Sequence, residues 1–189
     1  MSLRRLLLPT VLLAVSLPSV AATPGVGQRA PDFTLSTVNG ERLTLSSLTH
    51  KANVVLILLR GYPGYQCPFS QLQFQTYQQA AATFAATGTE IVFVYPGTDS
   101  KNLAEDAVQM TGNGHLPANV HLVIDPNYDF TNKYGLRWNE ANQTAYPTTF
   151  LLDKTGMVIF AHKGRTSSDQ TPASDALAVI NANTTAKKD

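Results

Sequence analysis

The chain has 189 residues and a formal net charge of +1, and 14% of its residues are charged. This length predicts one domain that buries a sizeable core, and the composition is that of an ordinary globular protein. The sequence has no basic stripe and no cluster of lysines, which argues against a nucleic-acid partner.

The first 22 residues have a character of their own. Two arginines precede an apolar run at 6–17, and small residues end it at 19–22. This order is typical of a cleaved secretory signal. A membrane anchor is the alternative, but two prolines interrupt a run that is already short for a span. We therefore expect a signal peptide at 1–22, a mature domain at 23–189, periplasmic or secreted localisation, and no stable membrane insertion.

The mature part is predicted to begin with a β-hairpin. Apolar residues alternate with polar ones at 33–36 and again at 42–45, on either side of an Asn-Gly pair at 39–40. Alternation on both sides of a tight turn is the signature of two antiparallel strands.

Strands and helices then alternate along the chain. Continuous apolar runs at 53–60, 89–96 and 119–126 are typical of strands buried on both faces of a sheet. Helical spacing and prolines in first turns predict helices at 68–87, 98–112, 128–136 and 171–183, and a second hairpin is predicted at 147–164. This order predicts an α/β fold with a central mixed sheet flanked by helices.

Cys67 is the only cysteine, and it lies where a predicted strand gives way to a predicted helix. The first N–H groups of a helix lack partners within the helix, and the helix dipole favours negative charge there. Such places lower the pKa of a cysteine thiol from about 8.5 to roughly 3.5–7.5. Open α/β sheets also place their functional crevice at the C-terminal ends of their strands. We therefore expect Cys67 to be a reactive thiol rather than an inert buried residue, the common alternative for free cysteine.

Other polar residues near and beyond this cysteine suggest lesser roles. Arg60 stands at the end of the same strand and is placed to add positive charge, while Tyr62 and Tyr65 are placed to wall a pocket or donate hydroxyl groups. The four histidines show no metal-ligand spacing, so we expect no metal and no cofactor. Asp125 and Asp153 each follow an apolar strand and are expected to cap or turn the chain rather than to catalyse a reaction.

Four segments of the chain carry a resemblance to a known family. They are "GQRAPDFTL" with "NGERLTLSSL", "LLRGYPGYQCPFS", "IDPNYDFTNKYGL" and "AYPTTFLLDKTGMVIFAHKG". In this order they resemble the redoxins of the thioredoxin-fold superfamily, and within it the alkyl hydroperoxide reductase/thiol-specific antioxidant group that includes the peroxiredoxins. The resemblance implies a thioredoxin-like fold with Cys67 as the reactive cysteine and Pro147 as a cis-proline facing it. The candidates for a substrate pocket are Tyr62, Gly64, Tyr65, Pro68, Ser70 and Tyr146.

The sequence departs from this family around the cysteine. Peroxiredoxins carry a threonine or serine three residues before the reactive cysteine and a proline seven before it, where this chain has Gly64 and Arg60. Their pocket arginine precedes the late strand, at about the place of Pro147. Thioredoxins have a second cysteine where Ser70 stands, and serine is able to hydrogen-bond a thiolate but cannot resolve a disulfide. The loop therefore resembles a dithiol site reduced to a single thiol.

The leading hypothesis is an exported thiol peroxidase with one cysteine. Cys67 would reduce a hydroperoxide with the help of Arg60, become a sulfenic acid, and be restored by an external thiol reductant. A monothiol thioredoxin-like oxidoreductase acting on a disulfide is an alternative, favoured by the glycine at position 64 and by the cis-proline that the resemblance implies at Pro147. A non-catalytic redoxin-fold binding module is another, favoured by Ser70. The oligomeric state also stays open, with a homodimer as one alternative.

Overall fold

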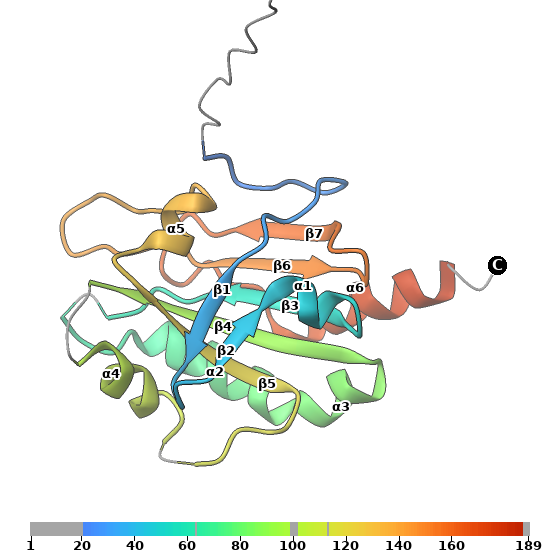
Figure 1. The fold of residues 1–189 in the computed structure, drawn as a ribbon, viewed down its shortest axis with the longest axis horizontal. Helices are drawn as coiled ribbons and strands as arrows, with labels where there is room; N and C mark the ends of the chain where they lie inside the picture. Colours follow the sequence, from blue (N-terminus) through green and yellow to red (C-terminus); the bar gives the residue numbers. More distant parts are fainter. Residues whose placement is uncertain (1–20, 63, 99–101, 113, 187–189) are drawn as a thin grey trace, which may run out of the picture.

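A computed structural model describes residues 21–62, 64–98, 102–112 and 114–186. Within this part of the chain, seven strands form one mixed sheet in the order β2-β1-β5-β4-β3-β6-β7, with helices on both faces (Figure 1). The strands are β1 (Thr34–Thr37), β2 (Arg42–Thr44), β3 (Asn53–Leu58), β4 (Thr89–Gly97), β5 (Val120–Pro126), β6 (Thr148–Leu152) and β7 (Val158–Lys163). The predicted α/β fold with a central mixed sheet is confirmed.

Parallel strands form the middle of the sheet, and antiparallel strands flank them. β3 pairs with β4, and β4 with β5, in parallel. β6 and β7 extend one edge in antiparallel pairing, and the hairpin of β1 and β2 extends the other. Both predicted hairpins are therefore confirmed. β3 lies between β4 and β6, and its C-terminal end leads into the loop that carries Cys67.

Successive residues of the central strands face opposite layers of helices. The helices are α1 (Leu45–Thr49), α2 (Pro68–Gln79), α3 (Ala81–Ala86), α4 (Leu103–Gln109), α5 (Asp129–Lys133) and α6 (Ala173–Ala186). Val55 and Ile57 share a core cluster with residues of α2, α3, α4 and α6, whereas Val54 and Leu56 pack with residues of α1 and α5. Because adjacent side chains of a strand point to opposite faces, an unbroken apolar strand is buried on both.

Helix α2 is held firmly against the sheet, which fixes the position of its first residue. Phe74 and Tyr77 of α2 are fully buried, and the ring of Phe74 lies 4.6 Å from the ring of Phe93 on β4. The Tyr77 hydroxyl donates to the carbonyl of Thr171, just before α6, at 3.2 Å. Helix α2 is therefore anchored through its middle and its C-terminal part, by contacts with both the sheet and the chain leading to α6.

The helices differ from the sequence prediction in several details. The helix predicted at 68–87 is two helices, α2 and α3, which meet at Ala80. Alanine is the best helix former, so residue type gives no warning of this break. The helix predicted at 98–112 is described only as α4, and part of that range lies outside the described residues. Helix α1 has no predicted counterpart.

The N-terminal prediction falls mostly outside the structure. The signal peptide expected at 1–22 is described only at its last two residues. Among the helices of the described part, none combines the length and the apolar character that a membrane crossing requires.

Candidate active site

Cys67 is the N-cap residue of α2, as the sequence predicts. Its backbone is extended, with φ −68° and ψ 116°, and Pro68 occupies the first turn of the helix. Proline suits that place because its ring presets φ and its missing N–H would have had no partner in the helix. The cysteine is free and its side chain is only 1% exposed. The sulfur therefore sits at the positive end of a 12-residue helix and away from bulk water.

Arg60 brings a positive charge to this sulfur. It follows β3, is 5% exposed, and places Nη1 3.8 Å from Cys67 Sγ. Burial acts to lower the pKa of Arg60, but hydrogen bonds to Tyr65 and Cys67 outweigh it and raise that pKa, so the guanidinium stays charged. Among the described residues, no carboxylate lies within salt-bridge distance of Arg60. A negative sulfur would be the counter-charge that this buried cation lacks.

Neutral oxygens hold the guanidinium in place. Nε of Arg60 donates to Gln143 Oε1 at 2.9 Å, and Nη2 donates to the carbonyl oxygen of Asn142 at 2.8 Å. Nη1 donates to the Tyr65 hydroxyl at 2.9 Å, in addition to its contact with the sulfur. The Thr144 hydroxyl donates to the backbone carbonyl of Arg60. Sequence reasoning missed the three residues at 142–144, because they lie over 80 residues from Arg60 along the chain.

The Ser70 side chain hydrogen-bonds to the backbone of Arg60 rather than to the sulfur of Cys67. Its side-chain oxygen accepts a hydrogen bond from the backbone N–H of Arg60 at 3.1 Å, and the residue is 1% exposed. The hydroxyl thus ties the first turn of α2 to the end of β3. Serine at this position has a structural task, which the comparison with a missing second cysteine did not reveal.

Replacement of Ser70 by cysteine is expected to create a dithiol that closes into a disulfide under mild oxidation. Positions 67 and 70 are the N-cap and the third residue of α2. The change also weakens the acceptor for the Arg60 N–H, so we expect the reduced variant to lose about 1 kcal/mol of stability. Thiol titration before and after oxidation, with urea unfolding of the reduced protein, measures both effects. Ser70→Ala is the control for the lost hydrogen bond; a variant whose two thiols both survive oxidation would contradict the prediction.

The loop between β3 and α2 turns sharply and is tied to its neighbours. Gly61 has φ +72°, and a Cβ there would stand 2.1 Å from the carbonyl oxygen of Pro96, so only glycine fits. Gln66 accepts a hydrogen bond from the Tyr95 hydroxyl at 3.0 Å and donates to the carbonyl of Asp106 at 2.5 Å. These contacts fasten the loop to β4 and α4.

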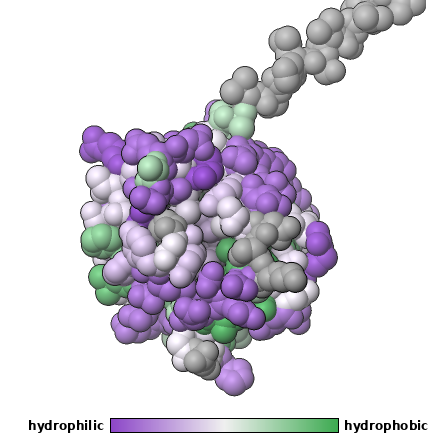
Figure 2. Space-filling model, turned by 90° about the vertical axis from the view of Figure 1, so that its left-hand side faces the viewer, coloured by the Kyte–Doolittle hydropathy of each residue, from purple (hydrophilic) through white to green (hydrophobic). Residues whose placement is uncertain are grey.

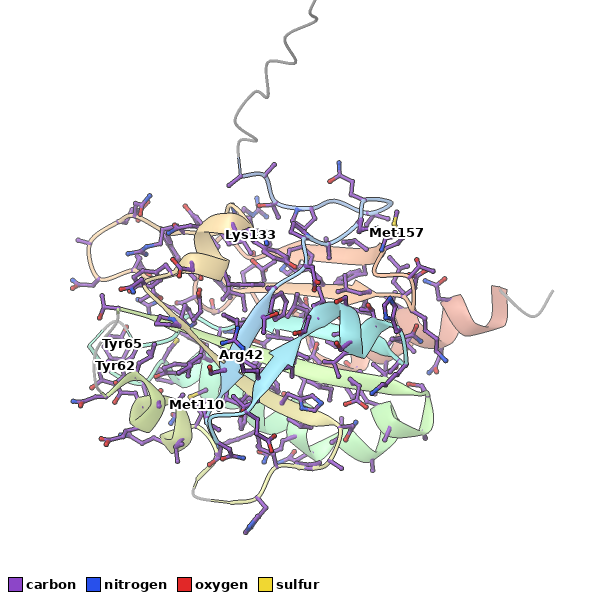
Figure 3. All side chains as sticks on the ribbon, in the orientation of Figure 1. Arg42, Tyr62, Tyr65, Met110, Lys133 and Met157 are labelled. Carbon is purple, nitrogen blue, oxygen red and sulfur yellow. The ribbon has the colours of Figure 1, made fainter. Side chains whose placement is uncertain are left out.

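Four of the six predicted pocket residues are exposed near Cys67, whereas Ser70 is buried and Tyr146 is half-buried. Tyr62 and Tyr65 both lie at the end of the molecule where β3 leads into α2 (Figure 3), and both are exposed. Phe69 and Leu72 of α2 are exposed as well. Figure 2 faces this end and shows hydrophobic side chains set among hydrophilic ones. Gly64 and Pro68 are also exposed in this loop.

Pro147 does not have the cis geometry that the resemblance implies. Among the described residues no peptide bond is cis, so the predicted cis-proline at position 147 is wrong. The trans form of an X–Pro bond is the intrinsically favoured one. The neighbouring backbone carbonyls have hydrogen-bond donors: the Tyr146 carbonyl accepts from Thr148 Oγ1 at 2.9 Å, and the Pro147 carbonyl accepts from Gly164 N at 2.8 Å. The Tyr146 ring stacks on Trp138 at 4.7 Å.

The two aspartates act on the backbone, as expected. The buried carboxylate of Asp125 accepts hydrogen bonds from the backbone N–H groups of Phe130 and Thr131 and from the Thr131 hydroxyl. Asp153 accepts from the backbone of Thr155 and Met157 in the turn between β6 and β7. The prediction that they cap or turn the chain is confirmed.

A mixed sheet of this topology, with a lone cysteine capping the helix that follows a central strand, defines a thioredoxin-fold redoxin with one cysteine. The sequence pattern of the AhpC/TSA family matches residues 26–161, and the chain belongs to this family. The family resemblance seen in the sequence is therefore confirmed.

Solved structures of redoxins share this fold. Peroxidoxin BcpB from Mycobacterium tuberculosis is 22% identical, with a TM-score of 0.67 over 84% of this chain and 97% of that one. The yeast mitochondrial 1-Cys peroxiredoxin is 13% identical, with a TM-score of 0.71 over 87% and 78% of the two chains. A structure described as thiol:disulfide interchange protein DsbE from Chlorobium tepidum is 26% identical, with a TM-score of 0.60 over 84% and 99%. No protein of curated function matches the sequence.

Proposed function

We propose that the protein is a one-cysteine thiol peroxidase that reduces hydroperoxides through Cys67. One observation carries this proposal: Nη1 of Arg60 lies 3.8 Å from the sulfur of the buried Cys67 thiol at the start of α2. Among the described residues, no carboxylate pairs with Arg60. A helix N-terminus and a nearby guanidinium both favour negative charge on a sulfur in general, and the thiolate is the nucleophilic form of cysteine. Membership of the AhpC/TSA family and the likeness to peroxiredoxins support the same activity.

The proposed reaction has two halves. The Cys67 thiolate attacks the terminal oxygen of the hydroperoxide, an S–O bond forms while the O–O bond breaks, and the alkoxide leaves as an alcohol after taking a proton from solvent. Cys67 is then a sulfenic acid. An external thiol condenses with it to a mixed disulfide and water, and a second thiol restores Cys67 while the external thiols leave as a disulfide. Because Cys67 is the only cysteine, both reducing thiols come from outside the chain.

Rapid-mixing oxidation of the purified protein tests the proposal. Hydrogen peroxide and an organic hydroperoxide, each in excess, should convert Cys67 to a sulfenic acid much faster than they oxidise free cysteine, and excess thiol should restore the original thiol. Cys67→Ser serves as the control and should consume no peroxide. Oxidation no faster than that of free cysteine would rule out the peroxidase.

The main alternative is a monothiol oxidoreductase that exchanges disulfides through Cys67. The glycine at position 64, where the peroxiredoxins carry a hydroxyl, favours it, and so does the likeness to the DsbE structure. The same protein, mixed with a small disulfide in place of peroxide, separates the two activities: fast mixed-disulfide formation with slow peroxide oxidation would favour exchange. A protein slow in both reactions would be a binding module.

Export is part of the proposal and rests on the N-terminal pattern alone. The arginine pair, the apolar run and the small residues at 19–22 support cleavage near residue 22. N-terminal sequencing of the protein from periplasm or culture medium tests this; a full-length chain found in the cytoplasm would contradict it.

A further inference from the structure

Arg60 is a buried cation whose oxygen acceptors, within the described part of the chain, are neutral. Gln143 Oε1, the Asn142 carbonyl and the Tyr65 hydroxyl each take one of its N–H groups, at 2.8–2.9 Å. Buried arginines usually pair with carboxylates, which fit the guanidinium fork and neutralise its charge. Here the acceptors orient the guanidinium and leave its full charge uncompensated. Among the residues that the structure describes, the remaining hydrogen-bond partner of the guanidinium is the sulfur of Cys67.

The segment that supplies two of these acceptors is itself held in shape by a second arginine. Nη1 of Arg137 donates to the carbonyl oxygens of Trp138, at 2.8 Å, and of Gln143, at 3.3 Å, and it also contacts the carbonyl of Thr144. Asn142 has a left-handed backbone, with φ +57°. Arg137 thus ties the backbone of Gln143 and Thr144 to that of Trp138. This contact holds the backbone from which the Gln143 side chain reaches Arg60.

We propose that Gln143 is a positioning residue that aims Arg60 at Cys67 without neutralising it. A carboxylate in its place would form a charge-assisted bond about twice as strong as the neutral one, and would compete with the thiolate for the same cation. An apolar side chain would remove the acceptor but leave the charge of Arg60 intact. This inference concerns the site of the proposed peroxidase and rests on that function only where peroxide kinetics are used.

Gln143→Glu is the decisive variant because it is nearly isosteric and changes only the charge of the acceptor. We expect oxidation by hydrogen peroxide near neutral pH to slow about tenfold, because a nearby carboxylate weakens the electrostatic support of the thiolate. The rate of Cys67 alkylation by iodoacetamide should be measured as a function of pH. We expect the midpoint of this pH profile to lie at higher pH in Gln143→Glu than in the parent protein. Gln143→Met should slow oxidation only a few-fold and leave the pH profile of alkylation nearly unchanged.

Gln79→Glu is the matched control, since it makes the same change of charge at an exposed position near the end of α2. Gln79 comes twelve positions after Cys67 along the helix, a rise of about 18 Å. Parent-like kinetics and pH profile in Gln143→Glu would overturn the inference. So would equal slowing in Gln143→Glu and Gln143→Met with no shift in the pH profile, which would mark Gln143 as merely structural. If the parent protein fails to react with peroxide, the proposed function fails, while the alkylation profile still tests the role of Gln143.

Discussion

Replacement of Arg60 by methionine is expected to slow the oxidation of Cys67 by hydrogen peroxide about 10²–10³-fold, the usual cost of removing a donor aimed at developing charge. Nη1 lies 3.8 Å from Sγ. In the proposed reaction it would support the thiolate and the oxygen that becomes negative as the O–O bond breaks. Methionine fills much of the same buried space without charge. The loss should appear in peroxide oxidation and in alkylation at neutral pH.

Stability should change little in Arg60→Met, because the lost hydrogen bonds are offset by no longer burying a cation. Arg42→Met is the matched control. Arg42 is exposed on β2, four strands away from β3 in the sheet (Figure 3), and its removal should leave both reactions unchanged. If Arg60→Met keeps the parent's peroxide and alkylation kinetics, Arg60 has no part in the site, and Tyr62 and Tyr65 become the next candidates.

Replacement of Asp125 by alanine is expected to lower the free energy of unfolding by about 2–4 kcal/mol, since it leaves buried donors without partners. The Asp125 carboxylate takes the backbone N–H groups of Phe130 and Thr131 at 2.7 and 2.9 Å. Both belong to the first turn of α5, where the helix offers them no acceptor. Urea unfolding measures the loss. The peroxide reaction of the folded variant should stay normal, because Asp125 contacts α5 and not Cys67.

The loss in Asp125→Ala should also depend on pH. Burial raises the pKa of Asp125 above the ordinary aspartate range, and the hydrogen bonds from Thr131 and Phe130 only partly offset this. The folded protein then keeps this proton to a higher pH than the unfolded chain, so parent stability falls as pH rises from the ordinary aspartate pKa through the raised one. The stability gap between parent and variant should therefore narrow over that interval.

Asp153→Ala is the comparison for this prediction. Asp153 also accepts backbone N–H groups, from Thr155 and Met157, but its turn is partly open to water. Water can replace the lost acceptor there, so we expect a loss of only about 0.5–1 kcal/mol. An Asp125→Ala variant no less stable than Asp153→Ala would show that the buried bonds at α5 contribute little.

The features that depend on local pattern were predictable from the sequence. Hairpins at both ends of the domain follow from alternation around short turns, and the central strands follow from unbroken apolar runs. Cys67 as the N-cap of α2 follows from the change of pattern at Pro68. The place of Arg60 beside the sulfur was predictable for the same reason, since both residues flank one short loop at the end of one strand.

What only the tertiary structure decided is how distant segments complete the site. Gln143 and Asn142 reach Arg60 across more than 80 residues, and no local period or spacing encodes such a contact. The break at Ala80 likewise depends on surrounding contacts, because alanine favours an unbroken helix. Local residue patterns thus predict that Cys67 and Arg60 lie close together. The neutral oxygens of Gln143 and Asn142 that bind Arg60 come from a distant segment, and only the packing of the chain brings them there.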